Sequence, residues 1–545
     1  MSKLPDWTAF TKDETDHRGL DPLGLAAIGS GIVQRRLLPG ITNTTEHIRY
    51  YSFFCWVFWT FWQKGRRAGR LSEQRKWRAR LENVLRAATL CREPNIVGLV
   101  GRRKAILTEH LSPNDHIRVD RVDVVSAFIP AFYSSSFRAL GCGKWTPDNG
   151  AQLTAFGEEL AEKFDLVVRG SAASRSALST ILTNERLIPV KAVRAIADAL
   201  AIRAVNPDEP EHSLLLELLL RLNTGKDQLN WQARSRSFAL LLEIVEQAQG
   251  KVLSGADLHR VFATGRLAND KNFVVPVELR LDFEIWKRYQ ERQYVKLSIY
   301  SLWHEVVQLL DYRISKTASA QQLLSHVRGA FEKSSLALKW FGPRYMQMRV
   351  GEAQQLLRMR LHDRPNEFGN SAMALTSTLV DLQRTSPERT GAAIVLLLLV
   401  SCYWTESQKE LEESRLHRVG GRDRLSLECV ALDMDEMRTV ALVDYLQWTV
   451  ENYVLKQATK TAIEKLPDYR YFIVRDDSGY RLVKKQNAAS YLSYDPSRIE
   501  SAFALMSELK LLHLSQGYRL TPAGRKVLQQ LHAHHRQRLT TLQSS

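Results

Sequence analysis

The sequence predicts a mainly α-helical, multi-domain protein that carries small β-hairpins. Long segments repeat apolar residues every three or four positions, as in HSLLLELLLRLN (212–223) and SRSFALLLEIVEQAQ (235–249), which is the period of a helix. Breakers such as NPDEP (206–210) and RVGGRDR (418–424) separate these segments. Near the C-terminus, two pairs of short β-rich runs flank turn residues, which is the pattern of hairpins.

The length of the chain bounds its domain count. A chain of 545 residues is expected to form three or four domains at about 150 residues each. Composition shifts and breakers divide it into an N-terminal helical domain (1–170), a helical middle domain (171–450) and a winged-helix-like domain (451–545). The N-terminal domain is expected to hold an aromatic core helix, a basic segment and a possible second winged-helix-like unit near 120–165.

The most apolar part of the chain is LLPGITNTTEHIRYYSFFCWVFWTFW (37–62), which we name the signature segment. Pro39-Gly40 predicts a turn, and the spacing of Asn43 and Glu46 predicts a capping box, so a helix should start near Thr44. The continuous apolar run has 13 residues, whereas a membrane-spanning helix needs about 20. We expect a buried core helix; a partner-binding groove or a membrane-surface contact is the alternative.

Other features favour a soluble, cytoplasmic protein. The first 30 residues are mixed polar and do not resemble a secretion signal. The five cysteines are scattered and odd in number, which predicts a reduced compartment with neither a disulfide framework nor a structural zinc. No cofactor-binding motif is present, and no membrane contact is expected.

Positive charge is concentrated in one segment. The chain carries a net charge of +17, and residues 63–103 hold 12 basic and 3 acidic residues, which is +9 of that total. A field of this sign attracts polyanions, of which nucleic acid is the commonest. Within the segment, LSEQRKWRARLENVLRAATL (71–90) predicts a helix whose apolar face leaves the arginines on the other faces. The alternative is a merely solvated helix face. The predicted nucleic-acid contacts are Arg66, Arg67, Arg70, Arg75, Lys76, Arg78 and Arg80.

The order of helices and hairpins in the C-terminal region can be predicted from the sequence. A hairpin is predicted over 471–483, a helix after Asp495, a second hairpin turning at Gln516-Gly517, and a final helix with Thr521 as its cap and Pro522 in its first turn. Helix, hairpin and helix in this order, with the phrase YRLTPAGRKVLQQL (518–531), resemble the end of a winged-helix domain. A shorter stretch with the same L-T-x-x-G pattern, LTAFGEELAEKF (153–164), occurs upstream.

The winged-helix resemblance implies a role. In members that bind DNA, the helix before the wing enters the major groove and the wing touches the backbone. Here the resemblance implies that residues 497–512 form the presented helix. Glu500 and Glu508 would oppose such contacts, and many winged helices bind protein instead. The contacts it implies are Arg498, Lys510, Arg519 and Arg525.

A search for catalytic motifs finds no P-loop, no HExxH helix and no GxSxG elbow. The stretch HLSPNDHIRVD (110–120) groups histidines with Asn and Asp, but a polar loop before a strand explains it as well. An enzymatic activity is therefore not expected, although dispersed catalytic residues would escape this search.

The signature segment also resembles a signature found in uncharacterised bacterial proteins encoded in anti-phage defence islands, of the form LLPGITNxTxxIRYYSFxxW. The resemblance implies a component of a multi-gene system that works beside a helicase or nuclease. We expect a non-catalytic, nucleic-acid-binding and assembly subunit whose partners are DNA and other subunits of a defence complex. The alternatives are a nuclease-type effector with an unrecognised active site and a pure protein scaffold.

Overall fold

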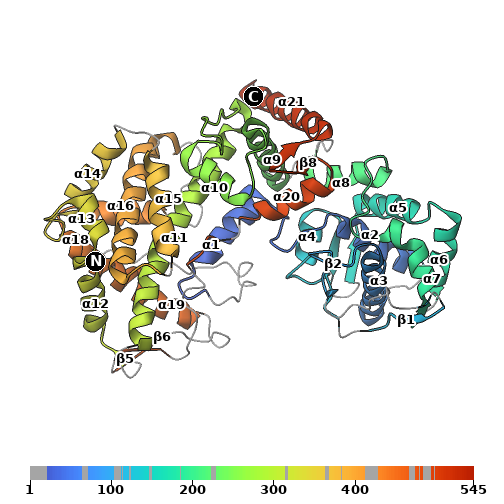
Figure 1. Ribbon diagram of the computed structural model, residues 1–545, viewed down its shortest axis with the longest axis horizontal. Helices are drawn as coiled ribbons and strands as arrows, with labels where there is room; N and C mark the ends of the chain where they lie inside the picture. The colour runs from blue at the N-terminus through green and yellow to red at the C-terminus, as the bar shows by residue number, and fades with distance from the viewer. Residues whose placement is uncertain are drawn as a thin grey trace. The chain divides into compact units, whose positions relative to one another are not determined.

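The structure is a computed structural model (Figure 1), mainly helical with small antiparallel sheets, as the sequence predicts. It describes residues 21–63, 71–102, 112, 114–121, 124–146, 150–183, 186–221, 229–312, 317–362, 367–381, 383–411, 427–464, 473–477, 479–482, 492–495 and 497–544. Contacts group the chain into unit 1 (Met1–Val33 with Ala256–Ser497) and unit 2 (Gln34–Gly255 with Arg498–Ser545). These units cross the boundaries predicted at 170 and 450, and residues 451–545 are divided between them.

Unit 1 is a helical assembly built around one long helix. Its elements are α1 (Leu25–Ile32), α10 (Gly255–Thr264), η4 (Val277–Leu279), α11 (Arg280–Tyr312), β5 (Thr317–Ala318), α12 (Ala320–Glu332), α13 (Ser335–Phe341), α14 (Val350–His362), α15 (Glu367–Val380), α16 (Ser386–Leu411), α17 (Leu427–Glu436), α18 (Leu442–Thr449), η6 (Val450–Lys456), α19 (Gln457–Glu464), β6 (Ile473–Asp476) and β7 (Gly479–Leu482). The first residue of α10, Gly255, belongs to unit 2.

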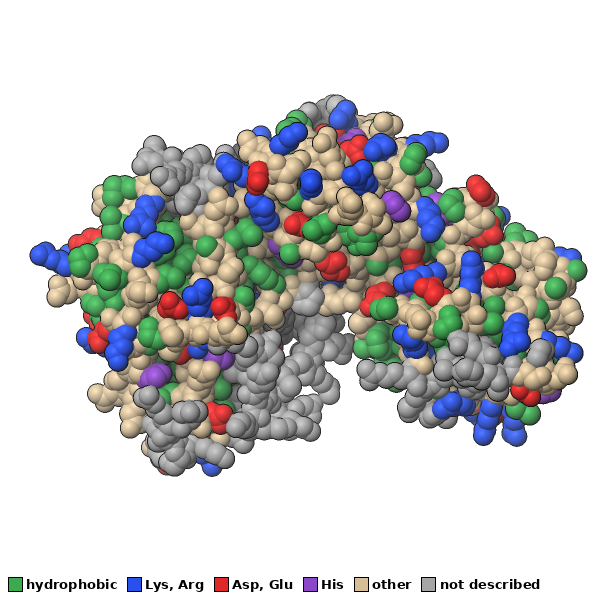
Figure 2. Space-filling model, viewed as in Figure 1, with side chains coloured by type: hydrophobic (Ala, Val, Ile, Leu, Met, Phe, Trp, Pro, Cys, Tyr) green, Lys and Arg blue, Asp and Glu red, His purple; other side chains and the backbone are tan. Residues whose placement is uncertain are grey.

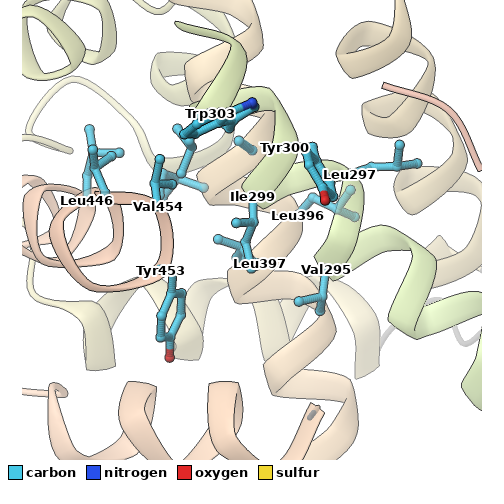
Figure 3. Packing of buried hydrophobic residues seen from close by; sticks show 14 of the residues in the cluster. Val295, Leu297, Ile299, Tyr300, Trp303, Leu396, Leu397, Leu446, Tyr453 and Val454 are labelled. Atoms are coloured by element: carbon cyan, nitrogen blue, oxygen red, sulfur yellow. The ribbon is translucent and has the colours of Figure 1, made fainter. Parts of the chain in front are cut away.

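The core of unit 1 lies where α11 and α16 pack against each other. Every residue of α16 from Ala392 to Val400 is buried, because this stretch is apolar on all sides and a helix of that kind needs neighbours all round. Figure 3 shows side chains of α11, α16, α18 and η6 in this core, among them Trp303, Leu397, Leu446 and Tyr453. Among the described residues, no helix combines the length and the apolar character that crossing a membrane requires.

The hairpin predicted over 471–483 is confirmed in unit 1. Strands β6 and β7 pair antiparallel, with Val474 opposite Arg481. The short strand β5 adds to the other edge of β7, a pairing between segments more than 150 residues apart that no local pattern predicts.

Unit 2 combines helices from both ends of the chain. Its elements are η2 (Val33–Leu37), α2 (Arg49–Gln63), α3 (Leu71–Arg92), β1 (His116–Arg118), α4 (Ser134–Ala139), β2 (Gly143–Thr146), β3 (Gly150–Leu153), α5 (Ala155–Val168), α6 (Ala172–Thr183), β4 (Leu187–Pro189), α7 (Val190–Leu200), α8 (Pro210–Leu220), α9 (Leu229–Ala248), α20 (Ile499–Glu508), β8 (Leu512–Leu514), β9 (Tyr518–Leu520) and α21 (Pro522–Ser544). Residue Val33 of η2 falls in unit 1.

The signature segment supplies the central helix of unit 2, α2. Phe53, Trp56, Val57, Phe58 and Phe61 are all buried, which confirms the predicted core helix. The predicted start near Thr44 is wrong, because α2 begins at Arg49. The residues before it instead form turns, held by the Thr45 hydroxyl, which donates to the Thr42 carbonyl at 2.8 Å.

Candidate nucleic-acid interface

The polar residues of the signature segment are structural anchors. The Arg49 guanidinium is fully buried and donates to both carboxylate oxygens of Glu211, at 3.0 Å for the closest pair, and to the Ala201 carbonyl at 2.8 Å. A buried ion pair is tolerated only when its remaining hydrogen-bonding capacity is also satisfied. These contacts join α2 to α8 and to the end of α7, so Arg49 has a packing role.

The N-terminus of α2 is capped from the far end of the chain. The Ile48 amide donates to Glu508 Oε2 at 2.9 Å, and His47 Nδ1 faces Glu508 Oε1. His47 Nε2 lies 2.8 Å from the Val97 carbonyl. Both ring nitrogens face oxygen acceptors, an arrangement that the doubly protonated ring satisfies. Burial by itself lowers the pKa of His47, but the hydrogen bond and charge of Glu508 outweigh burial, and the pKa lies above its ordinary value.

Unit 2 contains two helix–hairpin–helix modules, both expected from the sequence. The first module is α4–β2–β3–α5, and the second is α20–β8–β9–α21. In both, the second residue after the first helix has positive φ, Gly141 at 80° and Lys510 at 57°. In both, the next amide turns back to the helix, since Cys142 donates to the Phe137 carbonyl and Leu511 to the Met506 carbonyl.

The two modules also cap their second helices in the same way. The hydroxyls of Thr154 and Thr521 accept from the amides of Gly157 and Gly524, at 3.1 and 3.0 Å. A Cβ added to Gly157 would lie 2.0 Å from the Cys142 carbonyl oxygen, and one added to Gly524 would lie 2.1 Å from that of Leu511. The L-T-x-x-G phrase therefore marks a helix cap followed by a close approach of two backbones.

The predicted presentation of the helix before the second hairpin is wrong. Six of the ten residues of α20 are buried, and the only fully exposed one is the acidic Glu500. Arg498, a predicted contact, is itself only 9% exposed and donates to the Ile41 carbonyl. Because α20 has apolar residues on most sides, it packs into the core of unit 2 and does not present a basic surface.

The other predicted residues of the second module lie at its surface. Lys510, Arg519 and Arg525 are exposed. Arg519 lies across the hairpin from His513 and packs over Gly250. Arg525 is paired with Glu246 of α9 at 2.9 Å. This surface is basic, with one of its charges already neutralised by α9.

The basic helix α3 divides its charged residues between surface and core. Arg75 and Lys76 are exposed, whereas Arg78 has 12% of its side chain exposed and pairs with Glu82 at 3.3 Å. Arg80 is buried and donates to the Ile181 carbonyl at 2.9 Å. Burial lowers the pKa of the Arg78 guanidinium and so does the charge of Arg75, against the opposite effect of Glu82. Arg66, Arg67 and Arg70 lie outside the described residues. The structure thus leaves Arg75 and Lys76 on the solvent side of α3, which we name the basic face, and Arg78 lies at its edge.

The hairpin of the first module is fixed against α3 beside the basic face. Gln74 makes two hydrogen bonds with the backbone of Ala151, donating at 3.2 Å and accepting at 3.0 Å. Trp145 lies opposite Ala151 in the hairpin and is 42% exposed. Its ring centroid is 6.3 Å from that of Phe128, over which the Arg78 guanidinium sits at 5.4 Å.

Sequence reasoning missed Trp145 and its exposed neighbour Lys144. The available signal was the strand GKWT before the Pro-Asp-Asn-Gly turn, where Lys and Trp lie side by side in a short hairpin arm. A pattern of this kind does not say which face of a hairpin is covered, because both faces depend on the tertiary contacts.

Unit 2 carries further charges near strands β1 and β4. Arg118 of β1 and Arg186, which precedes β4, flank one acid, Asp120, at 2.7 and 4.0 Å. Figure 2 shows Lys and Arg side chains gathered at the lower right, where Figure 1 places β1. On α5, Glu158 and Glu159 are exposed, so negative charge lies on the helix that follows the first hairpin.

Fold and surface together define a helical protein with two hairpin modules and a basic, aromatic surface. Within the part of the chain that the structure describes, no three His, Cys, Asp or Glu side chains are grouped so as to hold a metal ion. Neither a family model, nor a curated protein, nor a solved structure matches the chain.

Proposed function

We propose that this chain is a nucleic-acid-binding and assembly subunit of a bacterial multi-protein anti-phage defence complex, acting without its own catalytic step beside a helicase or nuclease. The observation that carries the binding part is the basic face of α3. Arg75 and Lys76 are exposed, and the Phe128 ring is contacted both by Arg78, at the edge of this face, and by the exposed Trp145. The defence part is supported by the resemblance of the signature segment.

The charge of the basic face favours a polyanion over a solvated surface. A solvated helix face usually mixes both signs of charge, but Glu82 of α3 is buried and paired with Arg78 and Arg86. The negative charge of Glu82 is therefore balanced by cations inside the protein. Arg75 and Lys76 are left facing solvent, and phosphate is the group that such a cluster of cations binds.

The proposal is tested by the salt dependence of binding. Fluorescence anisotropy of the full chain with a labelled duplex and a labelled single strand would be recorded between about 50 and about 200 mM salt. In the double variant Arg75→Ala/Lys76→Ala, losing two phosphate contacts should reduce the slope of log affinity against log salt by about 1.8 on duplex and about 1.4 on single strands.

A charge-matched control separates this local effect from the loss of net charge. The variant Lys333→Ala/Lys339→Ala removes two exposed cations from unit 1 and should bind as the parent does. Equal behaviour of the two double variants would contradict the proposal and leave the basic face as a solvated surface. If the parent chain failed to bind at low salt, the scaffold alternative would take its place.

The role in defence needs a separate experiment. The gene with its neighbours would be placed in a phage-sensitive host, and plaques counted for the parent and the Arg75→Ala/Lys76→Ala variant. We expect protection by the parent system and its loss in the variant. Cleavage of labelled DNA by the purified chain with Mg²⁺ would instead favour the nuclease-type alternative. Protection that survives in the variant would show that the basic face is not needed for defence.

A further inference from the structure

We infer that Trp145 is a stacking platform for an unpaired nucleobase, so that the interface prefers single-stranded nucleic acid. The inference rests on the proposed function, because it names the form of nucleic acid that the basic face binds. Among the described residues, Trp145 is the only aromatic side chain in the set of large exposed apolar residues. The other large aromatic rings of that part of the chain are covered at least in part by the protein.

The Trp145 ring is held in place by the fold. Its strand pairs with β3, which is tied to α3 through the two hydrogen bonds between Gln74 and Ala151. The Phe128 ring supports it at 6.3 Å, and Phe128 in turn packs on Phe54 and Phe58, at 4.8 and 4.9 Å. A platform that is already ordered loses little side-chain entropy on binding a base.

The surroundings of Trp145 match a single strand. A phosphate backbone needs cations at the spacing of about one nucleotide from the stacked base. Arg78 lies over the Phe128 ring that supports Trp145, and Arg75 and Lys76 directly follow Gln74, which holds the hairpin. Single-strand binders combine such a groove of cations with aromatic rings that accept successive bases. In a duplex the flat faces of the bases are covered by their neighbours, so only the cations of this surface would take part.

An acidic protein segment is the competing ligand, since it would also use the cations. It would not use a fixed, partly open indole ring. Base stacking, which is sequence-tolerant and uncharged, is the interaction that remains available at the ring.

The experiment compares Trp145→Ala and Trp145→Phe with the parent chain on four probes: oligo-dT, oligo-rU, a duplex, and an abasic oligonucleotide that keeps the backbone but lacks bases. We expect Trp145→Ala to weaken binding of oligo-dT and oligo-rU by about 5- to 100-fold, the effect of losing one base–aromatic stack. The duplex and abasic probes should be unaffected, and the salt slope unchanged, because no phosphate contact is lost. Trp145→Phe should recover most of the loss.

The outcomes separate the inference from the proposed function. If the parent bound none of the four probes at low salt, the proposed function would fail. If the parent bound them and Trp145→Ala shifted none, the stacking inference alone would be overturned. An equal loss on all four probes, with a lowered melting temperature, would overturn it by giving Trp145 a structural role. A preference of the parent for oligo-dT over oligo-rU, or the reverse, identifies the nucleic acid.

Discussion

The two helix–hairpin–helix modules of unit 2 share a backbone and differ in their surfaces. Both have a positive-φ residue after the first helix, a threonine cap and a glycine against a carbonyl. At matching positions of the two hairpins, the first module exposes Lys144 and Trp145, and the second exposes His513 and Leu514. The recurring threonine and glycine mark the local fold, so the side chains between them carry whatever function each module has.

Charge is reversed in the helices that follow the hairpins. The positions directly after the shared glycine are Glu158 and Glu159 in the first module and Arg525 and Lys526 in the second. On the proposed function, the acidic pair would disfavour a phosphate on α5. In the second module Arg525 is engaged by Glu246, so its charge is partly used in holding α21 to α9. On the proposed function, the first module would therefore supply the aromatic contact, and the second a basic border.

The largest expected effect comes from breaking the support of the first module. Trp56 packs on Phe164 of α5 at 5.7 Å and donates to Asp165 at 2.8 Å. Trp56→Ala should lower the free energy of unfolding by about 3–5 kcal/mol through the cavity it leaves. Chemical denaturation followed by circular dichroism measures this loss.

A matched change tests the support of the second module. Leu531 of α21 is fully buried, and α21 packs against α9. Leu531→Ala should cost about 2–5 kcal/mol. An unchanged denaturation midpoint in Trp56→Ala would contradict the buried core helix that the sequence predicts. A loss confined to one of the two variants would show that only one module depends on this packing.

The shared glycines should respond alike. Gly157→Ala and Gly524→Ala each place a methyl group against a backbone carbonyl, so each should cost toward the upper end of the roughly 1–3 kcal/mol that overpacking costs. Gly329, in α12, has open space around its position, and Gly329→Ala should stabilise by about 0.4–1 kcal/mol. Melting curves of the three variants provide the comparison. Tolerance of alanine at either shared position would show that the two modules are not built alike.

Glu508 should reveal the difference between the modules, because the matching residue of the first module is Ala139. Glu508→Gln leaves the Ile48 amide and His47 with a weaker, neutral acceptor, at a cost of roughly 1–3 kcal/mol. The folded-state pKa of His47 is raised above its ordinary 6.5. Its stabilisation is therefore complete below about pH 6.5 and is lost as the pH rises through the folded-state pKa.

The pH dependence distinguishes this contact from a simple packing effect. The parent should lose stability as the pH rises from about 6.5 through the folded-state pKa of His47, and Glu508→Gln should lose less over the same range. Arg203 lies 3.7 Å from Glu508 and lowers the pKa of His47, so Arg203→Ala should move the loss to higher pH. Identical pH profiles of parent and Glu508→Gln would show that His47 does not titrate in this range.

The features that the sequence predicted correctly depend on short-range interactions, and those that it missed depend on long-range ones. Local signals located α2, the C-terminal hairpin and the Thr521 cap, because capping and periodicity act within a few residues. The start of α2 was missed because its cap is Glu508, some 460 residues away in the chain. The same distance explains why Arg498 was predicted at the surface, although its partner, the Ile41 carbonyl, lies in the signature segment.

The candidate site was predicted in part. A count of charges located α3, and its apolar face, including Trp77 and Leu81, is buried as expected. Spacing alone did not show that Arg80 would bind the Ile181 carbonyl, a contact with another helix. Trp145 was missed because exposure is a property of the packed fold. Whether the basic face binds nucleic acid stays a prediction until it is measured.

The smallest effect on stability is expected from the exposed cations of the second module. Lys510→Ala/Arg519→Ala removes two surface charges and should change the free energy of unfolding by less than about 0.5 kcal/mol. Arg498→Ala, by contrast, leaves the Ile41 carbonyl without its buried donor, at about 1–3 kcal/mol. Binding should respond in the opposite order, because only the exposed pair can meet phosphate. Thermal unfolding and duplex anisotropy of the same two variants measure both effects. If the exposed pair left duplex binding unchanged, the second module would have no part in the interface, and the first module with the basic face of α3 would constitute it alone.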